Sequence, residues 1–230
     1  MLNGLFDPAT VLVYLPRLLL KLPVTLLIVV TATVCGAAGG MMLALVRLFR
    51  TPVLNQAALV YISFMRGTPI VVQLFLVFYG VPLLLGHLGI DINRWDKLYF
   101  VILAYALNTA AFKAEVFRAA LQSVPAGQAE AAYAVGLTRL QCFRRIIAPQ
   151  ALLIALPSLG TGLAALLQDT SLAYTLGVVD VMGQVHAIAS GTNRMLEGYV
   201  GAALIFLALS VVLEKGFGRV EAGLLLKRHS

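Results

Sequence analysis

The chain has 230 residues, of which 60% are hydrophobic and 12% are charged, and its formal net charge is +7. A soluble domain of this length needs more charge to keep its surface in water, so the composition excludes an ordinary soluble enzyme or binding module. It indicates an integral membrane protein. In such a chain the positive charge reports topology, and we expect no nucleic acid among its partners.

The first apolar run, Leu22–Val46, contains no charged residue and is longer than the roughly 20 residues that cross a bilayer. A cleaved signal peptide has an apolar region of only about 7–15 residues, so this run is predicted to be a retained span. The preceding segment, residues 8–21, is apolar except for Arg17 and Lys21, which share one helix face. We expect this segment to form an interfacial helix.

Four further apolar regions follow the first span. Residues 52–86 are broken by "RGTP" at Arg66–Pro69, and we interpret them as one interrupted crossing, because the part before the break is too short to span alone. The others cover about residues 98–112, 151–167 and 199–213. The predicted fold is therefore all-α: a polytopic integral membrane protein with about five transmembrane helices in a single transmembrane domain over residues 1–230.

The basic residues predict the orientation, because they are enriched in cytoplasmic loops. With five crossings the two termini face opposite sides of the membrane. Eleven basic residues fall on the C-terminal side, against five on the other side. The eleven are Arg47, Arg50, Lys113, Arg118, Arg139, Arg144, Arg145, Lys215, Arg219, Lys227 and Arg228, and the five are Arg17, Lys21, Arg94, Lys97 and Arg194. We therefore expect the N-terminus outside and the C-terminus in the cytoplasm.

A polar block, "QAEAAYAVGLTRLQCFRRIIAPQ", lies between two apolar regions on this cytoplasmic side. Its alanines favour a helix, and Gly136 stands near the helix end, where a helix often stops or approaches another backbone. We predict a short cytoplasmic helix within residues 126–138. A rigid surface helix between two spans is suited to docking into a cleft on another protein; the plain alternative is an interhelical linker.

This block resembles the EAA loop of ABC-transporter permeases, in which Glu-Ala-Ala is followed at fixed spacing by glycine, isoleucine and Leu-Pro. Here the pattern reads Glu130-Ala131-Ala132, Gly136, Ile146 and Ala148-Pro149, with alanine in place of the leucine. Most of the chain is similar to the polar amino acid permeases of the histidine, glutamine and cystine type. That similarity is carried by "FMRGTPIVVQLFLVFYG", "AEVFRAALQSVPAGQAEAA" and "LLQDTSLAYTLGV".

The resemblance implies a permease subunit like those of type I ABC importers, in a bacterial inner membrane. In that family the EAA helix sits in a groove of a cytoplasmic ABC ATPase dimer, which assigns ATPase coupling to Glu130, Ala131, Ala132 and Gly136. It further implies an extracytoplasmic amino acid-binding protein, a second permease subunit in a homo- or heterodimer, and membrane lipid as partners. The substrate is expected to be a polar amino acid, cystine or glutamine among the candidates, moved by alternating access.

The chain has no ATPase motif of its own. A phosphate loop requires G-x-x-x-x-G-K-[ST], and the nearest match, Gly177 to Gly183, has the wrong spacing and is followed by Gln184. The three histidines show no metal-ligand spacing, and no nucleophile elbow is present. We therefore expect no catalytic site, no metal site and no cofactor in this chain, with ATP and Mg bound by the partner ATPase.

Polar side chains inside the spans are the candidates for substrate contact, because such groups are costly in a bilayer. Asn108 lies roughly 15 Å along its span, near the bilayer centre, and either contacts substrate or makes an interhelical hydrogen bond. Arg66 precedes a helix break that exposes backbone amides, or else snorkels to an interface. Glu115, together with Lys113, comes near the cytoplasmic interface, where an ion pair is the alternative.

The end of the fourth span supplies three more candidates: Gln168, Asp169 and Ser171. Asp169 either receives a substrate ammonium or caps the next helix. Gly36 and Gly40 of the first span permit close helix packing, more often within one subunit than across a dimer. An ion-gradient-driven secondary transporter remains an alternative function, since it also has broken spans and buried polar residues, and a structural membrane protein would lack these mid-membrane groups.

Overall fold

The computed structural model describes residues 6–226, and the side chains of residues 6–223. Lys227 and Arg228, which enter the orientation count, lie outside the described residues, as do residues 1–5 of the predicted domain. All regular elements of the described part are helices, and it contains no strand. Five helical stretches are long and apolar enough to cross a membrane: Leu22–Phe49, Ile70–His87, Lys97–Gln122, Arg139–Leu176 and Met195–Gly223. The prediction of an all-α protein with five spans is confirmed.

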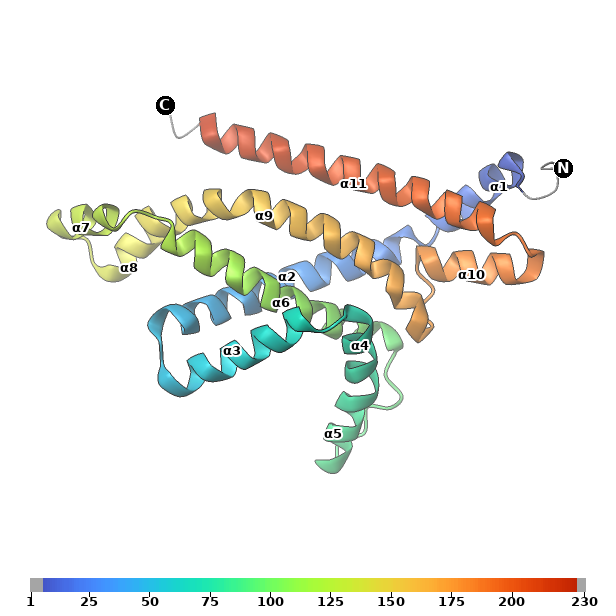
Figure 1. Cartoon of the computed structure of the whole chain (residues 1–230), viewed down its shortest axis with the longest axis horizontal. Helices are drawn as coiled ribbons and strands as arrows, with labels where there is room; N and C mark the ends of the chain where they lie inside the picture. The colour runs from blue at the N-terminus through green and yellow to red at the C-terminus, as the bar shows by residue number, and fades with distance from the viewer. Residues whose placement is uncertain (1–5, 227–230) are drawn as a thin grey trace.

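Helices α2 (Leu22–Phe49), α6 (Lys97–Gln122), α9 (Ala148–Asp169) and α11 (Met195–Leu226) run along the long axis of the molecule (Figure 1). The short helices α7 (Ala126–Ala134) and α8 (Arg139–Cys142) lie at the same end as the C-terminal part of α11. At the opposite end lie α1 (Pro8–Leu19) and α10 (Val181–Thr192). The polar block and the last residues of α11 therefore share one end of the molecule, as the predicted topology requires.

Helices α2 and α6 pack closely against each other through small residues. A side-chain Cβ at Gly36 would lie 2.6 Å from the Thr109 Cβ, and one at Gly40 would lie 2.9 Å from the Ala110 carbonyl oxygen. Only glycine allows the two backbones to approach this closely, as in small-residue packing between membrane helices. Gly36 and Gly40 thus pack helices within one subunit, which is the interpretation that the sequence favoured.

The second apolar region is broken where the sequence predicts it. Helix α3 (Pro52–Gly67) ends before Thr68, which is extended, and α4 (Ile70–Phe75) begins after Pro69. A residue before proline is pushed out of the helical region, so the chain turns at this point. Only the part after the break, Ile70–His87, is long and apolar enough to span on its own. The interruption is confirmed, and the spanning length of the region lies entirely after it.

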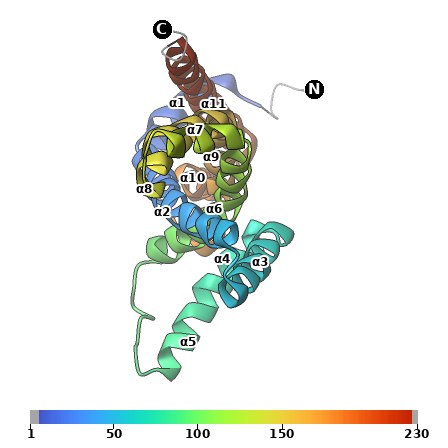
Figure 2. The same cartoon turned by 90° about the vertical axis from the view of Figure 1, so that its left-hand side faces the viewer.

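After the break, α4 continues through the π-helical turn η1 (Leu76–Gly80) into α5 (Val81–His87). Pro82 has no backbone N–H, and a proline clashes with the carbonyl of the fourth preceding residue, which accounts for the widened turn before it. Both views show α4 and α5 projecting away from the long helices (Figure 1, Figure 2). We refer to Ile70–His87 as the arm.

The N-terminal helix α1 is fixed to α11 by packing and by a polar contact. Leu18 is fully buried in a cluster with Val181, Val185, Ala202 and Ile205. Glu197 of α11, only 2% exposed, accepts hydrogen bonds from the Asp7 backbone N–H at 3.1 Å and from Arg194 at 3.0 Å. The predicted helix over residues 8–21 is present over Pro8–Leu19, and its place in the membrane interface stays a prediction.

Helix α9 continues through the 3₁₀ helix η3 (Thr170–Leu176) to Gly177, and α10 follows after a short turn. Asp180 caps α10 by accepting the Gly183 N–H at 2.8 Å. The residue is fully buried, and burial raises the pKa of Asp180 to about 6. This cap sets α10 against the end of η3, at the same end of the molecule as α1.

Candidate functional site

A cavity of about 250 Å³ lies between the end of α3, the middle of α6 and the second half of α9. It contains four of the six predicted substrate residues, Arg66, Asn108, Glu115 and Asp169. The rest of its lining is Thr109, Phe112, Lys113, Val116, Ser158, Leu159, Gly162, Ala165 and Leu166. Residues far apart in the sequence thus meet in one cavity, and we call it the charged cavity.

Helix periodicity explains which residues of α6 and α9 reach the charged cavity. Asn108, Phe112 and Glu115 are spaced by four and three residues, so they lie along one face of α6. Ser158, Gly162 and Asp169 share a face of α9 in the same way. Two predicted residues fall outside this face: Gln168 is exposed and Ser171 is half-buried, and neither lines the charged cavity.

Arg66 reaches the charged cavity from the C-terminal end of α3. Its guanidinium carbon lies 5.6 Å from the centre of the Phe112 ring, which is within the range of a cation–π contact. The side chain is exposed, and no carboxylate of the described residues forms an ion pair with it. A guanidinium held on an aromatic face in this way can accept a carboxylate as a bidentate partner.

Asn108 makes the interhelical hydrogen bond that the sequence left as an alternative. Its Nδ2 donates to the Gln73 Oε1 at 2.9 Å, while Gln73 Nε2 donates to the Met65 carbonyl at 2.8 Å and to Thr68. Gln73 is 1% exposed, so it is a buried polar link between α4, the helix break and α6. The sequence analysis missed Gln73, although a lone glutamine in "IVVQLF" was a usable signal.

Glu115 is held in an ion-pair cluster. Its Oε1 accepts from Arg47 of α2, and its Oε2 accepts from Arg118 Nη2 at 2.7 Å and Nε at 3.0 Å. Arg118 also donates to Gln122 at 2.7 Å. The ion-pair alternative is therefore the observed one: Glu115 lines the charged cavity, but two arginines already balance its charge, which argues against its predicted role as a substrate ligand.

Asp169 does not cap the next helix, because its side chain makes no capping hydrogen bond to η3. The backbone carbonyl of Asp169 accepts the Tyr105 hydroxyl, which fixes the end of α9 against α6. The carboxylate is half-buried, and within the described part of the chain it has no hydrogen-bond or ion-pair partner. Of the two alternatives, the geometry favours a carboxylate directed to a ligand in the charged cavity.

The predicted cytoplasmic helix is shorter than expected. Helix α7 covers Ala126–Ala134, not residues 126–138. Gly136 follows with a left-handed φ of 82°, Leu137 N–H donates to the Ala132 carbonyl at 3.0 Å, and Gly136 N–H donates to the Tyr133 carbonyl at 2.9 Å. These two bonds form a Schellman motif, which ends a helix and requires glycine at this position.

Of the two roles that the sequence offered for Gly136, a helix stop or a close approach to another backbone, the structure shows the helix stop. A Cβ at Gly136 would meet no described atom within 4 Å, so the glycine is not needed for close packing within this chain. Its left-handed backbone turns the chain from α7 into α8. Thr138 then begins α8 with a capping box to Gln141. Local hydrogen bonds of the backbone and of the Thr138 and Gln141 side chains therefore set the turn from α7 into α8.

Most side chains of this loop are exposed. Ala132 is 5% exposed and packs inward, whereas Glu130, Ala131 and Gly136 face outward. Three large apolar side chains are exposed beside them: Tyr133 at 49%, Val135 at 78% and Leu140 at 65%. An exposed apolar surface at the polar end of a membrane protein is typical of a protein-docking surface. We call residues 126–142 the coupling loop.

The π-helical turn η2 (Phe143–Ile147) joins the coupling loop to α9. Pro149 follows in the first turn of α9, where a helix tolerates a residue without a backbone N–H. Because Pro149 cannot donate to a carbonyl of the preceding turn, the regular α-helical hydrogen bonding is interrupted there, next to the π-helical turn. Gln150 donates to the Ile146 carbonyl at 2.9 Å and to Gln128 at 3.3 Å, which links α7 to the start of α9.

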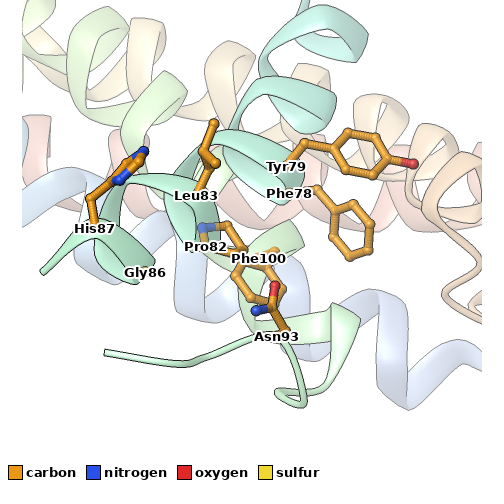
Figure 3. A pocket seen from close by; sticks show the side chains of 8 residues that line it. All are labelled: Phe78, Tyr79, Pro82, Leu83, Gly86, His87, Asn93 and Phe100. Atoms are coloured by element: carbon orange, nitrogen blue, oxygen red, sulfur yellow. The ribbon is translucent and has the colours of Figure 1, made fainter. Parts of the chain in front are cut away.

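A second cavity of about 460 Å³ lies between the arm and α6 (Figure 3). Its lining is mostly apolar and aromatic: Phe78, Tyr79, Pro82, Leu83, Gly86, His87, Asn93 and Phe100. It contains no carboxylate, no lysine and no arginine. A zwitterionic ligand requires opposite charges, so this cavity is a poorer candidate than the charged cavity.

Comparison with known proteins gives consistent matches. The sequence profile described as "Binding-protein-dependent transport system inner membrane component" matches residues 36–223. The L-cystine transport system permease protein TcyL of Bacillus subtilis is 45% identical over 216 residues, covering 94% of this chain and 90% of that protein. The glutamine transport system permease protein GlnP of Escherichia coli K12 is 34% identical over 193 residues, covering 82% and 86%.

A solved structure, described as the crystal structure of an amino acid ABC transporter with histidines, matches this fold with a TM-score of 0.82. The two chains are 30% identical, and the match covers 94% of this chain and 98% of the other. The similarity therefore extends over nearly the whole length of both chains.

Proposed function

This chain belongs to the family of binding-protein-dependent transport system inner membrane components and is a permease subunit of an ABC importer for amino acids, and we propose that it carries a polar amino acid such as cystine or glutamine. The observation that supports the substrate class is the charged cavity, which gathers Arg66 from the end of α3, Asn108 from α6 and Asp169 from α9. An amino acid presents a carboxylate and an ammonium, and this cavity offers a positive group for the first and a negative group for the second.

The proposed contacts follow from the charged groups that have no ion-pair partner among the described residues, Arg66 and Asp169. The guanidinium of Arg66 is positioned for the substrate carboxylate and the Asp169 carboxylate for the ammonium. Asn108 lines the same cavity and already donates to Gln73, so it adds at most the second N–H of its amide. Cystine is the first candidate, because the Bacillus subtilis relative, 45% identical to this chain, is an L-cystine transport system permease protein. Glutamine is the second, from the name of the Escherichia coli relative.

Transport is proposed to be coupled to ATP through the coupling loop. The ordered turn at Gly136 presents α7 and its exposed apolar side chains to a cytoplasmic ATPase dimer, and the links from α7 to α9 transmit movement to the charged cavity. ATP and Mg are bound by that ATPase. The energy for alternating access therefore comes from a partner of this chain.

The remaining parts of the assembly follow from the ends of the molecule. The end with α1 and α10 is proposed to face outward, toward an amino acid-binding protein, with the C-terminus in the cytoplasm. The chain lies in a bacterial inner membrane and pairs with a second permease subunit, either another copy or a related chain. The projecting arm offers apolar surface for that subunit or for lipid: Leu76, Tyr79, Leu83 and Leu84 are all more than half exposed.

The experiment is reconstitution of this chain with its ATPase and binding protein in liposomes, followed by uptake of labelled L-cystine and L-glutamine. We expect uptake of one of them that requires hydrolysable ATP and the binding protein, and none with a non-hydrolysable analogue. Uptake by this chain alone on an imposed ion gradient, independent of ATP, would contradict the proposal and support a secondary transporter.

A further inference from the structure

Lys113 is a buried cation in the wall of the charged cavity. It lies in α6, is 8% exposed, and lines the charged cavity together with Arg66 and Asp169. Its Cβ packs against Gly40 of α2, where a side-chain Cβ would lie only 2.9 Å from it. The nearest polar partner of Nζ is the Thr33 backbone carbonyl, at 3.1 Å.

No carboxylate of the described chain pairs with Lys113. The ion pairs of the described residues join Glu115 to Arg47 and Arg118, and Arg194 to Asp7 and Glu197. A lysine ammonium inside a membrane span is costly, and it is retained where it pairs with a counter-charge or serves a transported ligand. One carbonyl oxygen does not balance a full positive charge.

The charge balance of the cavity is therefore positive. Glu115 is balanced by its two arginines, which leaves Arg66, Lys113 and Asp169 as the groups without a described charge partner. A zwitterionic amino acid can place its carboxylate at the cations and its ammonium at Asp169. Cystine has two ammonium groups, but each is matched by a carboxylate, so its net charge is zero. An amino acid with a net positive charge brings a second positive group with no carboxylate of its own, and that group would face the buried ammonium of Lys113.

We propose that Lys113 is a substrate-binding residue that supplies a counter-charge to a substrate carboxylate and excludes amino acids with a net positive charge, such as arginine. The inference rests on the proposed function, because it assumes that the charged cavity holds the transported amino acid. It makes Lys113 the residue that determines charge selectivity within the membrane, separately from any selectivity of the binding protein.

The experiment measures equilibrium binding of labelled L-cystine and L-arginine to the complex of this chain and its ATPase in nanodiscs, without the binding protein. The variants are Lys113→Met, Lys113→Gln and Lys113→Arg. The glutamine side chain of Lys113→Gln can still donate to the Thr33 carbonyl but carries no charge, so this variant separates the effect of the hydrogen bond from the effect of the charge. Lys215→Met, an exposed lysine of α11 that does not line the charged cavity, is the matched control.

We expect the wild type, Lys113→Arg and Lys215→Met to bind cystine and exclude arginine. Lys113→Met and Lys113→Gln should both bind cystine at least about tenfold more weakly and gain measurable arginine binding, because removing one partner of a buried charge pair commonly changes affinity by this much or more. Size-exclusion chromatography checks that each variant is folded. We expect Lys113→Met to fold, because an apolar side chain is favoured inside a membrane span.

Two results overturn the inference while leaving the proposed function intact. In one, Lys113→Met binds both amino acids with affinities within twofold of the wild type. In the other, Lys113→Gln behaves as the wild type and only Lys113→Met differs, which would assign Lys113 to the bond with Thr33. If the wild type binds neither amino acid, the charged cavity is not the substrate site, and the proposed function fails with it.

Discussion

The coupling loop and the charged cavity are built in opposite ways. The coupling loop is continuous in sequence, mostly exposed, and ordered by local hydrogen bonds at Gly136 and Thr138. The charged cavity is discontinuous and draws on α3, α6 and α9. The loop therefore has its shape before any partner binds, whereas the cavity exists only when three helices pack together. This difference explains why a short motif identifies the former and no motif identifies the latter.

The strongest test separates the two regions by reversing one charge in the coupling loop. Glu130→Lys is expected to abolish ATP-dependent uptake, because it places the opposite charge on an exposed docking surface, while cystine binding in the charged cavity stays unchanged. The measurements are uptake in liposomes and copurification of the ATPase. Glu214→Lys, an exposed glutamate of α11, is the control. If Glu130→Lys takes up substrate at the wild-type rate, the coupling loop is not the surface that docks onto the ATPase.

The second test compares two carboxylates within the charged cavity. Asp169→Asn removes the carboxylate without a described partner, and we expect amino acid affinity to fall by about tenfold or more with thermal stability unchanged. Glu115→Gln removes a carboxylate held by Arg47 and Arg118, and we expect lower thermal stability with affinity largely kept, since two arginines lose their partner. Binding and thermal unfolding of the same preparations measure both quantities. If Glu115→Gln lowers the affinity and Asp169→Asn lowers the thermal stability, Glu115 is the substrate ligand and Asp169 the structural carboxylate.

The smallest expected effect concerns the backbone of the coupling loop. Gly136→Ala should lower the stability of the local turn by about 1 kcal/mol, because alanine is strained at the left-handed φ that the Schellman motif requires. Gly127→Ala is the matched control: Gly127 lies inside α7, also has open space around it, and has no positive φ, so alanine there should be neutral or stabilising. Hydrogen exchange of residues 126–142 measures the difference. Equal protection in both variants would mean that the turn does not depend on glycine.

Local features of the fold could be predicted from particular residues. The uninterrupted run from Leu22 predicted α2, and the pair Gly36 and Gly40 predicted close packing with another helix of the same subunit. The break at Arg66–Pro69 was predicted because proline restricts the residue before it. The end of α7 was placed four residues too late, because a glycine at C′ stops a helix before the glycine itself.

The charged cavity was only partly predictable. Arg66, Asn108 and Asp169 were found because polar residues are costly inside spans, a rule that needs no knowledge of neighbours. The same rule selected Gln168 and Ser171, which face elsewhere, and gave Glu115 a role that Arg47 and Arg118 already occupy. Gln73 and Lys113 were visible in the sequence, but their importance depends on Asn108 and Thr33, which lie 35 and 80 residues away.

The sequence by itself determined the membrane class, the number of spans, the helix break and the motif of the coupling loop. These are set by hydrophobicity and by backbone preferences that act over a few residues. Only the tertiary structure decided which charges are balanced and which are available to a ligand. A buried charge is stabilised by groups within about 4 Å in space, and in a helical membrane protein such groups come from helices distant in the chain.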